Sequence, residues 1–470
     1  MSPTKDLNRK KNYTFHEFTY SFCPDCNLKV PAKIIFRDKR VLLQKRCPKH
    51  GMLEHLLEED QDFYLKSSQF DKPGTLSKTQ NKVKLGCPYD CGLCEDHEQH
   101  TCIGLIEVTN SCDLGCPVCY ASSGKGKFLE LTTIEKMLDF YQDSEFGKAE
   151  ILQISGGEPT MHPDILKIIA LAKAKKFKYI MLNTNGLKIA ADEAFVAELS
   201  KFKGGFEIYL QYDGQAAKTY QALRGRDIAK EKQKAIALLT KYQIPITLVT
   251  TVAAGVNENE LGSILNFGLK TKFIRGVNFQ PIAYFGRLPG KQEEAKRITL
   301  TGILKRIESQ TSGMIKKNDF IPLPCHVERV AFTYLYREGD QFIPVTRNMA
   351  AQKYVPMIEN TFTFYPEDVI KNLAKGIIIC NDGNCFQFFK DFRKIIPANY
   401  RLKSKSSKYE HINNNTFRIS VSSFIDQYNF DMKSVKKECV HIITPDLKKI
   451  PFSTFNMFYR SKYLKEFYAS

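Results

Sequence analysis

Three cysteines with the spacing C-x3-C-x2-C form the stretch of this 470-residue chain with the most evident chemistry. They are Cys112, Cys116 and Cys119, and they follow directly on the β-like run 105–110. Three thiolates can hold three corners of a cubane iron–sulfur cluster, which four cysteines normally close. The fourth iron then stays open to a small molecule, like the open position of a catalytic metal site. The triplet therefore predicts a catalytic cluster, with a zinc knuckle or three unrelated loop cysteines as alternatives.

Two turns further along the chain give this triplet a context. The turn Ser-Gly-Gly-Glu-Pro at 155–159 ends the strand-like run 150–154, and Asn-Thr-Asn-Gly at 183–186 ends the run 179–182. The triplet with its downstream Gly-Gly-Glu turn resembles the signature of the radical S-adenosylmethionine (radical SAM) superfamily. The resemblance implies a partial (β/α)6 barrel and a [4Fe–4S] cluster that binds SAM. It also implies that SAM is cleaved to a 5′-deoxyadenosyl radical, which abstracts hydrogen from an unactivated C–H bond.

Five short stretches also stand out, at 86–94, 155–160, 182–186, 276–281 and 324–325. They resemble the branch with archaeal tetraether-lipid synthase and the class D radical SAM methylases of pterin metabolism. This narrower resemblance implies C–C bond formation between lipid chains, with methylation of a pterin or another small metabolite as the alternative. A non-catalytic iron–sulfur electron carrier is the alternative from another class of protein.

The chain has 14 cysteines, and in a reducing compartment such thiols bind metal more often than they form disulfides. Two knuckles frame a β-like stretch at 30–43, a pattern that suits one tetrahedral ion. Zinc is the default metal, and a rubredoxin-like mononuclear iron is the alternative. The predicted ligands of this N-terminal site are Cys23, Cys26, Cys47 and His50.

Two more cysteine groups predict auxiliary clusters. The spacing C-x3-C-x2-C occurs a second time without a preceding strand, and a fourth cysteine follows it eight residues later. We expect this group to form a closed auxiliary [4Fe–4S] cluster. The family resemblance implies that the C-terminal cysteines, or His326, hold a second one; buried thiols without metal are the alternative. The first group is Cys87, Cys91, Cys94 and Cys102, and the second is Cys325, Cys380, Cys385 and Cys439.

Alternating strand and helix patterns must position these groups. Six βα units in about 200 residues predict parallel strands with right-handed crossovers, with an open doubly wound sheet as the alternative to the partial barrel. A capping box at 132–135 predicts the start of one helix. The fold class is therefore α/β, with N-terminal metal-knuckle and iron–sulfur segments and an α+β C-terminal domain. The expected domains are 1–65, 66–103, 104–318 and 319–470, the last with a polar insertion at 402–416.

Ligand sites in such barrels lie at the C-terminal ends of the strands, and the expected SAM-binding residues lie there in the sequence. Glycines would let the backbone approach the methionine amine. Arg224 or Arg226 could meet the SAM carboxylate in a bidentate fashion. Ordinary turn chemistry is the alternative for the Asn-Gly and Asp-Gly pairs. The predicted residues are Tyr120, Gly156, Gly157, Glu158, Asn183, Asn185, Gln211, Asp213 and Arg224.

Composition limits the partners and the location. The net charge of +18 favours an anionic substrate, either lipid or a small molecule, while no recognisable RNA-binding module supports nucleic acid. SAM cleavage implies an electron donor such as ferredoxin or flavodoxin. No apolar run reaches the roughly 18 residues of a membrane span, and the N-terminus lacks the pattern of a signal peptide. We expect a cytoplasmic protein with at most peripheral membrane contact.

Overall fold

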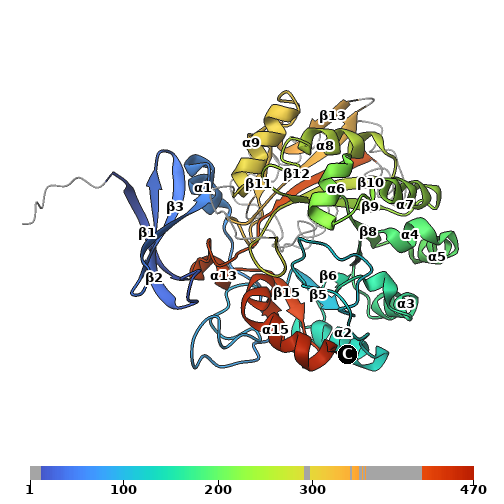
Figure 1. Cartoon of the computed structure of the whole chain (residues 1–470), viewed down its shortest axis with the longest axis horizontal. Coiled ribbons are helices and arrows are strands. Elements are labelled where there is room, and N and C mark those ends of the chain that lie inside the picture. Colours follow the sequence, from blue (N-terminus) through green and yellow to red (C-terminus); the bar gives the residue numbers. More distant parts are fainter. Residues whose placement is uncertain are drawn as a thin grey trace, which may run out of the picture.

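The computed structural model describes residues 12–289, 297–338, 341–348, 352, 355 and 415–469. These residues form two sheets, a small N-terminal one and a large one that runs through the rest of the chain (Figure 1). None of the helices in the described ranges is both long and apolar enough to cross a membrane.

The N-terminal sheet has four antiparallel strands in chain order, where the sequence suggested only a β-like stretch between two knuckles. Alternating apolar residues such as Ile34, Val41 and Leu43 form its small core. Helix α1 (Gln61–Ser67) follows, and its first turn is capped by Asp60, whose side chain accepts a 3.0 Å hydrogen bond from the Phe63 amide. The strands are β1 (Thr14–Phe22), β2 (Lys29–Arg37), β3 (Arg40–Cys47) and β4 (Gly51–Glu58).

The large sheet is built around six parallel strands that pair in chain order, as the sequence predicted. One face packs on the helices through residues such as Leu152 and Ile180, and the other face presents Met181, Tyr209 and Val249. The strands are β5 (Ile103–Glu107), β6 (Ile151–Ser155), β7 (Tyr179–Thr184), β8 (Phe206–Gln211), β9 (Ile246–Val252) and β10 (Ile274–Pro281).

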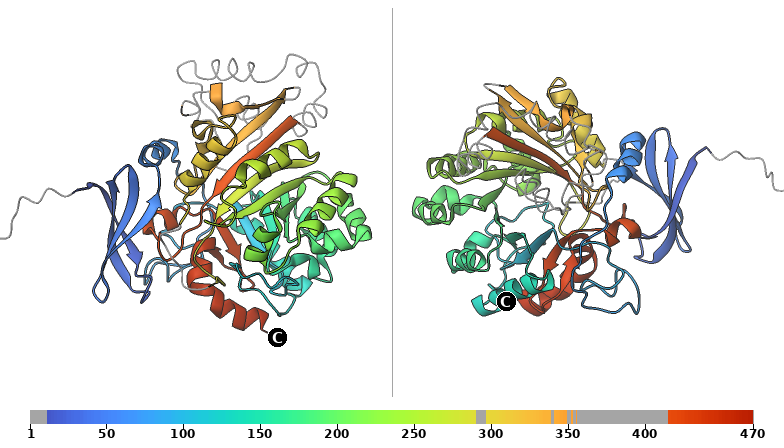
Figure 2. Two further views of the ribbon diagram at one scale, coloured as in Figure 1. Left: turned by 45° about the horizontal axis from the view of Figure 1, so that its top comes forward. Right: turned by 180° about the vertical axis from the view of Figure 1, so that it is seen from behind.

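Amphipathic helices follow the strands and cover one side of the sheet (Figure 2). The predicted capping box at 132–135 is wrong, because the helix there begins at Leu131 after Glu130, with no side-chain cap. The helices are α2 (Leu131–Ser144), α3 (Ile165–Ala174), α4 (Leu187–Ala191), α5 (Glu193–Leu199), α6 (Ala217–Arg224), α7 (Ala229–Lys241), α8 (Leu261–Lys270) and α9 (Leu300–Gln310).

The C-terminal part of the chain extends this sheet at both edges. Strand β14 (Thr416–Ser422) adds parallel to β10, and β15 (Val440–Ile443) adds parallel to β5. Beyond β14 lie the antiparallel strands β12 (Val330–Glu338) and β11 (Ile321–Pro322), while β16 (Lys449–Pro451) ends the opposite edge. The short strand β13 (Gln341–Pro344) pairs with β12. The fold class is confirmed as α/β, with an open sheet whose two edges are not hydrogen-bonded to each other in the described strands.

The C-terminal residues return to the central strands as short helical segments. Arg460, in α15 (Arg460–Tyr463), is buried and forms a bidentate ion pair with Glu107 at the end of β5, at 2.8 and 3.0 Å. The Tyr468 hydroxyl donates a 2.6 Å hydrogen bond to the Glu107 carbonyl. The stretch 455–468 therefore covers the end of β5, next to the cysteine triplet.

Candidate active site and metal centres

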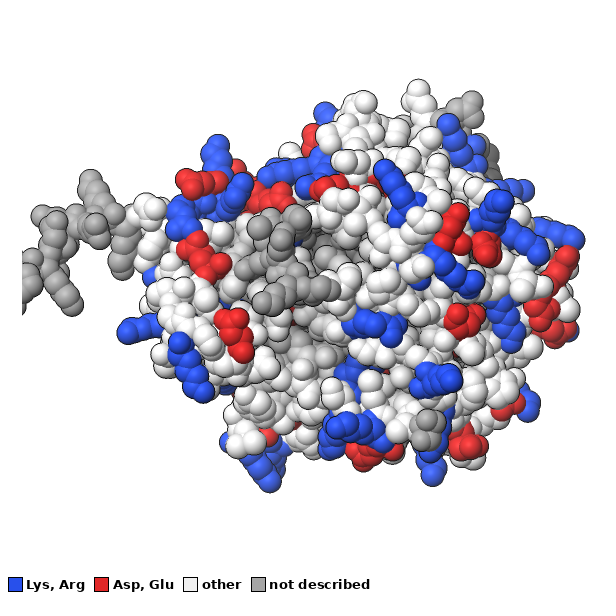
Figure 3. All heavy atoms as spheres, in the orientation of Figure 1, with Lys and Arg blue, Asp and Glu red and all other residues white. Residues whose placement is uncertain are grey.

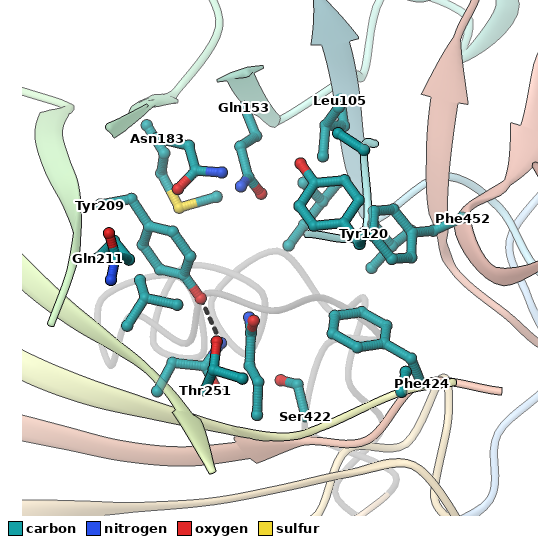
Figure 4. Close-up of a pocket in the computed structure, with 18 of the residues that line it drawn as sticks. Leu105, Tyr120, Gln153, Asn183, Tyr209, Gln211, Thr251, Ser422, Phe424 and Phe452 are labelled. Atoms are coloured by element: carbon teal, nitrogen blue, oxygen red, sulfur yellow. Dashed lines mark hydrogen bonds between the residues drawn. The ribbon is translucent and has the colours of Figure 1, made fainter. Parts of the chain in front are cut away.

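The thiols of Cys112, Cys116 and Cys119 line one cavity of about 250 Å³ beside the carboxyl ends of the parallel strands. Eight of the nine residues predicted to contact SAM line the same cavity. The exception is Asp213, which is fully buried behind it. Figure 4 shows side chains from several strands converging on this space. The topology thus brings the predicted residues together, as expected for the C-terminal edge of a parallel sheet.

The two glycines of the Gly-Gly-Glu turn let that turn pack against the chain that leads into the triplet. A Cβ on Gly156, where φ is +134°, would lie 2.2 Å from the Thr109 carbonyl oxygen. A Cβ on Gly157 would lie 2.3 Å from the Ser111 carbonyl oxygen. The Gly157 amide donates to Thr109 O at 2.8 Å, so the two loops are hydrogen-bonded. The glycines are therefore required for backbone packing, apart from any contact that they make with SAM.

Glu158 holds the second and third strand ends together. Its buried carboxylate accepts hydrogen bonds from the Thr160 amide at 3.0 Å, the Thr184 hydroxyl at 2.7 Å and the Asn185 amide at 2.7 Å. Burial raises the pKa of this carboxyl above its usual value. The four hydrogen bonds, which include one from the Thr160 hydroxyl, only partly offset this effect. The same side chain lines the cavity.

Arg224 is held by Asp213 rather than free to meet a ligand carboxylate. Both partners are buried, and the guanidinium contacts both carboxylate oxygens at 2.7 Å. Burial lowers the pKa of Arg224, but Asp213 and then Cys116 outweigh it and raise the pKa above its usual value. Arg226, the alternative in the sequence, is exposed and does not line the cavity. The ion pair places one fixed positive charge beside Cys116.

The remaining predicted residues form short hydrogen-bonded chains. Asn183 donates to the Ser155 hydroxyl at 3.0 Å, and that hydroxyl lies 3.1 Å from the Tyr120 hydroxyl. Asn185 donates to Asp113 at 2.7 Å, and Gln211 donates to Asp213. These hydrogen bonds hold the side chains that line the cavity in fixed positions.

Lys232 is a buried ammonium that the sequence did not single out among the lysines of 230–241. It donates hydrogen bonds to the Asn185 carbonyl and, at 3.1 Å, to the Gln211 side-chain oxygen. Burial lowers its pKa to about 7, an effect that Asp213 partly offsets. Lys232 thereby supports two cavity residues from behind.

The part of the cavity inside the sheet has a polar wall that the sequence also did not reveal. Gln153, Tyr209, Asn278 and Arg418 line it, the last from β14. Asn278 donates a hydrogen bond to the hydroxyl of Tyr209, a residue labelled in Figure 4. The Asn278 side-chain oxygen is buried and has no hydrogen-bond partner among the residues that the structure describes.

Aromatic rings form a second wall of the cavity. The ring of Phe452 lies 5.2 Å from that of Tyr120 and 4.7 Å from that of Phe424, measured between centroids. Figure 4 shows these rings on one side of the space and the polar residues on the other. The cavity thus combines flat apolar faces with hydrogen-bonding edges.

The triplet itself fits a cluster. Burial raises the pKa of Cys112 to about 12, so its thiolate needs a cation to form at neutral pH. The Leu114 amide donates to Cys112 Sγ at 3.4 Å, and the Ser123 hydroxyl lies 3.3 Å from Cys119 Sγ. Hydrogen bonds to sulfur of this kind stabilise thiolate ligands and tune iron–sulfur clusters.

The N-terminal set is also brought together. Ligand atoms of Cys23, Cys26, Cys47 and His50 all lie within 4.8 Å of one another. Cys23 Sγ is 3.3 Å from His50 Nδ1, and the sulfurs of Cys26 and Cys47 are 3.8 Å apart. Such a compact Cys3His set suits one tetrahedral ion.

The first triplet in chain order, which is Cys87, Cys91 and Cys94, lies in a loop beside a separate small pocket. The three cysteines line this pocket together with Asp96 and His97. The prediction that Cys102 completes this group is wrong. Cys102 Sγ lies 3.3 Å from Cys325 Sγ, which is in turn 3.2 Å from Cys439 Sγ. The parallel pairing of β5 with β15 sets Cys102 beside Cys439, a long-range contact that cysteine spacing does not reveal.

The predicted C-terminal group is accordingly regrouped by the structure. Cys325 and Cys439 join Cys102, whereas Cys380 and Cys385 lie outside the described residues. His326, the alternative ligand, has its Nε2 atom 3.1 Å from the Ser434 hydroxyl oxygen.

Comparison with protein families gives two matches. Residues 106–268 match the family model described as radical SAM superfamily, and residues 15–59 match the one described as HMPTM N-terminal zinc ribbon domain. The second match supports zinc over iron at the Cys3His set. Together with the cysteine groups, the matches support a SAM-binding [4Fe–4S] cluster, auxiliary clusters and a zinc ion.

Individual proteins are similar over different lengths. The 7,8-dihydro-6-hydroxymethylpterin dimethyltransferase of Methanocaldococcus jannaschii is 32% identical over 96% of this chain and 95% of that protein. The GTP 3′,8-cyclase of Clostridium botulinum is 24% identical over 51% of this chain and 70% of the cyclase. Among solved structures, SuiB of Streptococcus suis bound to precursor peptide SuiA covers 64% of this chain and 69% of its own. Its TM-score is 0.37, at 14% identity.

Proposed function

Because this chain belongs to the radical SAM superfamily, and within it to the family of that archaeal pterin dimethyltransferase, we propose that it is a radical SAM methyltransferase acting on a pterin-like heterocycle. A [4Fe–4S] cluster held by Cys112, Cys116 and Cys119 would, when bound, supply the electron that cleaves SAM to a 5′-deoxyadenosyl radical. The remaining tasks, which are binding, orientation and exclusion of water, belong to the residues of the cavity.

The strand ends would orient SAM. Asn183, Asn185 and Gln211 present amide groups to the cavity beside the triplet, and each is fixed by a hydrogen bond from behind. Fixed amides can bind the ribose hydroxyls and the methionyl end without losing side-chain entropy on binding. Arg224, already paired with Asp213, would act through its charge beside Cys116 rather than as a bidentate clamp on the SAM carboxylate.

The observation that carries the choice of acceptor is the two-sided wall of the cavity. The unpartnered Asn278 oxygen can accept a hydrogen bond from a ring N–H, and Gln153 and Arg418 add further polar groups. Tyr120 and Phe452 offer faces on which a planar ring can stack. A pterin has both flat faces and a row of hydrogen-bonding edge atoms. The name of the 32% identical relative supports the same substrate class.

Coupling of lipid chains is the second candidate, favoured by the apolar residues in the lining of the cavity. They include Phe285, Leu288, Leu323, Val330 and Phe332. A hydrocarbon chain needs such a surface and leaves the Asn278 oxygen without a partner, at a cost of about 1–3 kcal/mol for a buried polar group. The polar wall therefore favours the heterocycle.

The test is anaerobic turnover with SAM that carries a deuterated methyl group. The reconstituted protein receives a reductant and, in parallel, 6-hydroxymethyl-7,8-dihydropterin or a glycerolipid with saturated chains. The SAM that is cleaved keeps its methyl group in methionine, so methylation from SAM uses a second SAM, which leaves as S-adenosylhomocysteine. We expect deuterium in the pterin product, together with 5′-deoxyadenosine, methionine and S-adenosylhomocysteine, and no coupled lipid. Formation of 5′-deoxyadenosine with no change of mass in either acceptor would contradict the proposed acceptor, and coupled lipid would establish the second candidate.

Asn278→Leu sharpens this test, because it removes the unpartnered oxygen and keeps a similar volume. We expect kcat/KM for the pterin to fall about 10- to 100-fold, the size of one lost buried hydrogen bond. The yield of 5′-deoxyadenosine without acceptor should stay unchanged, since Asn278 lies in β10, which is five strands away from β5 in the order of the sheet. An unchanged kcat/KM would remove Asn278 from the substrate site.

A further inference from the structure

Cys102, Cys325 and Cys439 form a buried cluster of thiols from three distant parts of the chain. Cys102 directly precedes β5, Cys439 directly precedes β15, and Cys325 follows β11. The Cys102 amide donates a 2.8 Å hydrogen bond to the Cys439 carbonyl, at the start of the parallel β5–β15 pair. Leu323 and Val330 pack around the three sulfurs.

The distances between the sulfurs indicate which metal species fits. At 3.2 and 3.3 Å, the sulfurs are too far apart for a disulfide, whose S–S bond is about 2.05 Å. Thiolates on one tetrahedral ion, with bonds of about 2.3 Å, lie about 3.8 Å apart. Cysteines on a cubane cluster bind separate irons and stand further apart. The Cys26–Cys47 distance in the zinc ribbon, 3.8 Å, is the same kind of spacing.

The two triplets differ from this arrangement. Within the described part of the chain, only the ribbon set and the Cys102–Cys325–Cys439 set bring three or more metal-ligating atoms within 4.8 Å of one another. The auxiliary [4Fe–4S] cluster that the family resemblance implied for the C-terminal cysteines therefore does not fit these three.

We propose that Cys102, Cys325 and Cys439 bind a single thiophilic divalent ion, Zn²⁺ or Fe²⁺, and that this ion joins the two edges of the open sheet. In the order of strands, β11 stands at one edge and β15 lies next to the other. A ligand that follows β11 and two ligands that precede β5 and β15 thus come from opposite ends of the sheet. The described ligands leave one position for water, as in other three-ligand zinc sites.

His100 can form a hydrogen bond to one of the sulfur ligands of this ion. Its Nδ1 accepts a 3.2 Å hydrogen bond from the Thr75 amide, so in the neutral ring the proton is on Nε2. Nε2 lies 3.5 Å from Cys102 Sγ and can donate to the thiolate. Such a bond partly balances the charge of three thiolates on a divalent ion. His100 is thus a positioning residue and not a ligand.

The test counts metals in the full holoprotein. Each [4Fe–4S] cluster contains equal numbers of iron and acid-labile sulfide, so single ions appear as metal in excess of sulfide. We expect an excess of two ions per chain, one in the ribbon and one at this site. An excess of only one in the wild-type protein would overturn the proposal, and this result does not depend on any variant folding.

Cys325→Ser adds a second measurement. We expect the excess to fall by one ion with labile sulfide unchanged, and amide hydrogen exchange to quicken in β11 and β15. Loss of iron and sulfide together would identify a cluster and overturn the proposal. His326→Gln and the Cys380→Ser/Cys385→Ser double variant are matched controls that should keep the full excess, and loss of the ion in either would place the ligands elsewhere. His100→Ala should keep the ion but weaken its retention against a chelator.

Discussion

Two loops of this chain carry the same spacing of three cysteines, yet their surroundings differ in almost every respect. Cys112, Cys116 and Cys119 follow a buried parallel strand and open into the main cavity. Cys87, Cys91 and Cys94 follow a segment with no strand of its own and face a separate small pocket. The difference shows that spacing selects the metal chemistry, whereas the strand and its neighbours select which triplet meets a substrate.

The supporting interactions of the two loops differ in the same way. The second triplet, which is Cys112, Cys116 and Cys119, has the buried Arg224–Asp213 ion pair beside it. The Gly156–Gly157 turn packs against the chain that leads into this triplet. The first triplet depends on Asp90, whose carboxylate accepts three 2.7 Å hydrogen bonds from the amides of Lys84, Leu85 and Gly86. Buried support should be costly to remove, and exposed support should affect only its own loop.

Asp213→Asn is expected to have the largest effect on stability. It leaves Arg224 as a buried cation without its partner, which costs about 3–5 kcal/mol in the free energy of unfolding. Urea unfolding measures the loss. Glu193→Gln breaks the exposed ion pair with Lys241 and is the control, with no measurable change expected. Equal losses in the two variants would mean that the pair beside Cys116 is not energetically special.

Gly156→Ala should come next. The new Cβ would clash with the Thr109 carbonyl in a left-handed region of backbone space, at a cost on the order of 1–3 kcal/mol. We expect weaker SAM binding by calorimetry and unchanged iron at the first triplet. Gly124→Ala is matched to it, because a Cβ there meets no heavy atom within 4 Å. Normal SAM binding by the Gly156→Ala protein would show that this turn does not contribute to the SAM site.

Lys232→Met tests the buried ammonium through pH. The pKa of Lys232 is lowered by burial to about 7 in the folded protein, below the value of about 10.4 in an unfolded chain. Between these values the unfolded state binds more protons, so wild-type stability should rise with pH relative to the variant. The slope is at most about 1.4 kcal/mol per pH unit and is lost as pH falls through 7. Parallel stability curves for the two proteins would contradict this account.

Asp90→Asn should have the smallest effect. The amides of Lys84, Gly86 and Leu85 lower the pKa of Asp90, so its contribution is present at neutral pH and lost as pH falls through the lowered value. We expect partial loss of iron from the first triplet only, measured as iron and labile sulfide per chain. Loss of SAM binding in this variant would erase the distinction between the two loops.

Patterns local in sequence predicted much of this structure. The six strands, the turns at their ends and the four ligands of the ribbon were all visible, because apolar periodicity and cysteine spacing are local signals. Contacts made between distant segments were not. Strands β14 and β15 join the central sheet from beyond residue 415, and through them Arg418 enters the cavity and Cys439 meets Cys102. Likewise nothing near Lys232 distinguishes it, since its burial depends on the packing of α7 against Asn185 and Gln211.

The central claim is that the triplet after β5 is the one that cleaves SAM, and counting 5′-deoxyadenosine in two serine variants tests it most directly. Cys112→Ser and Cys91→Ser proteins are reconstituted anaerobically, checked for labile sulfide and incubated with SAM and dithionite. The account predicts no 5′-deoxyadenosine from Cys112→Ser and continued formation from Cys91→Ser. Formation of 5′-deoxyadenosine by Cys112→Ser, with none from Cys91→Ser, would contradict it.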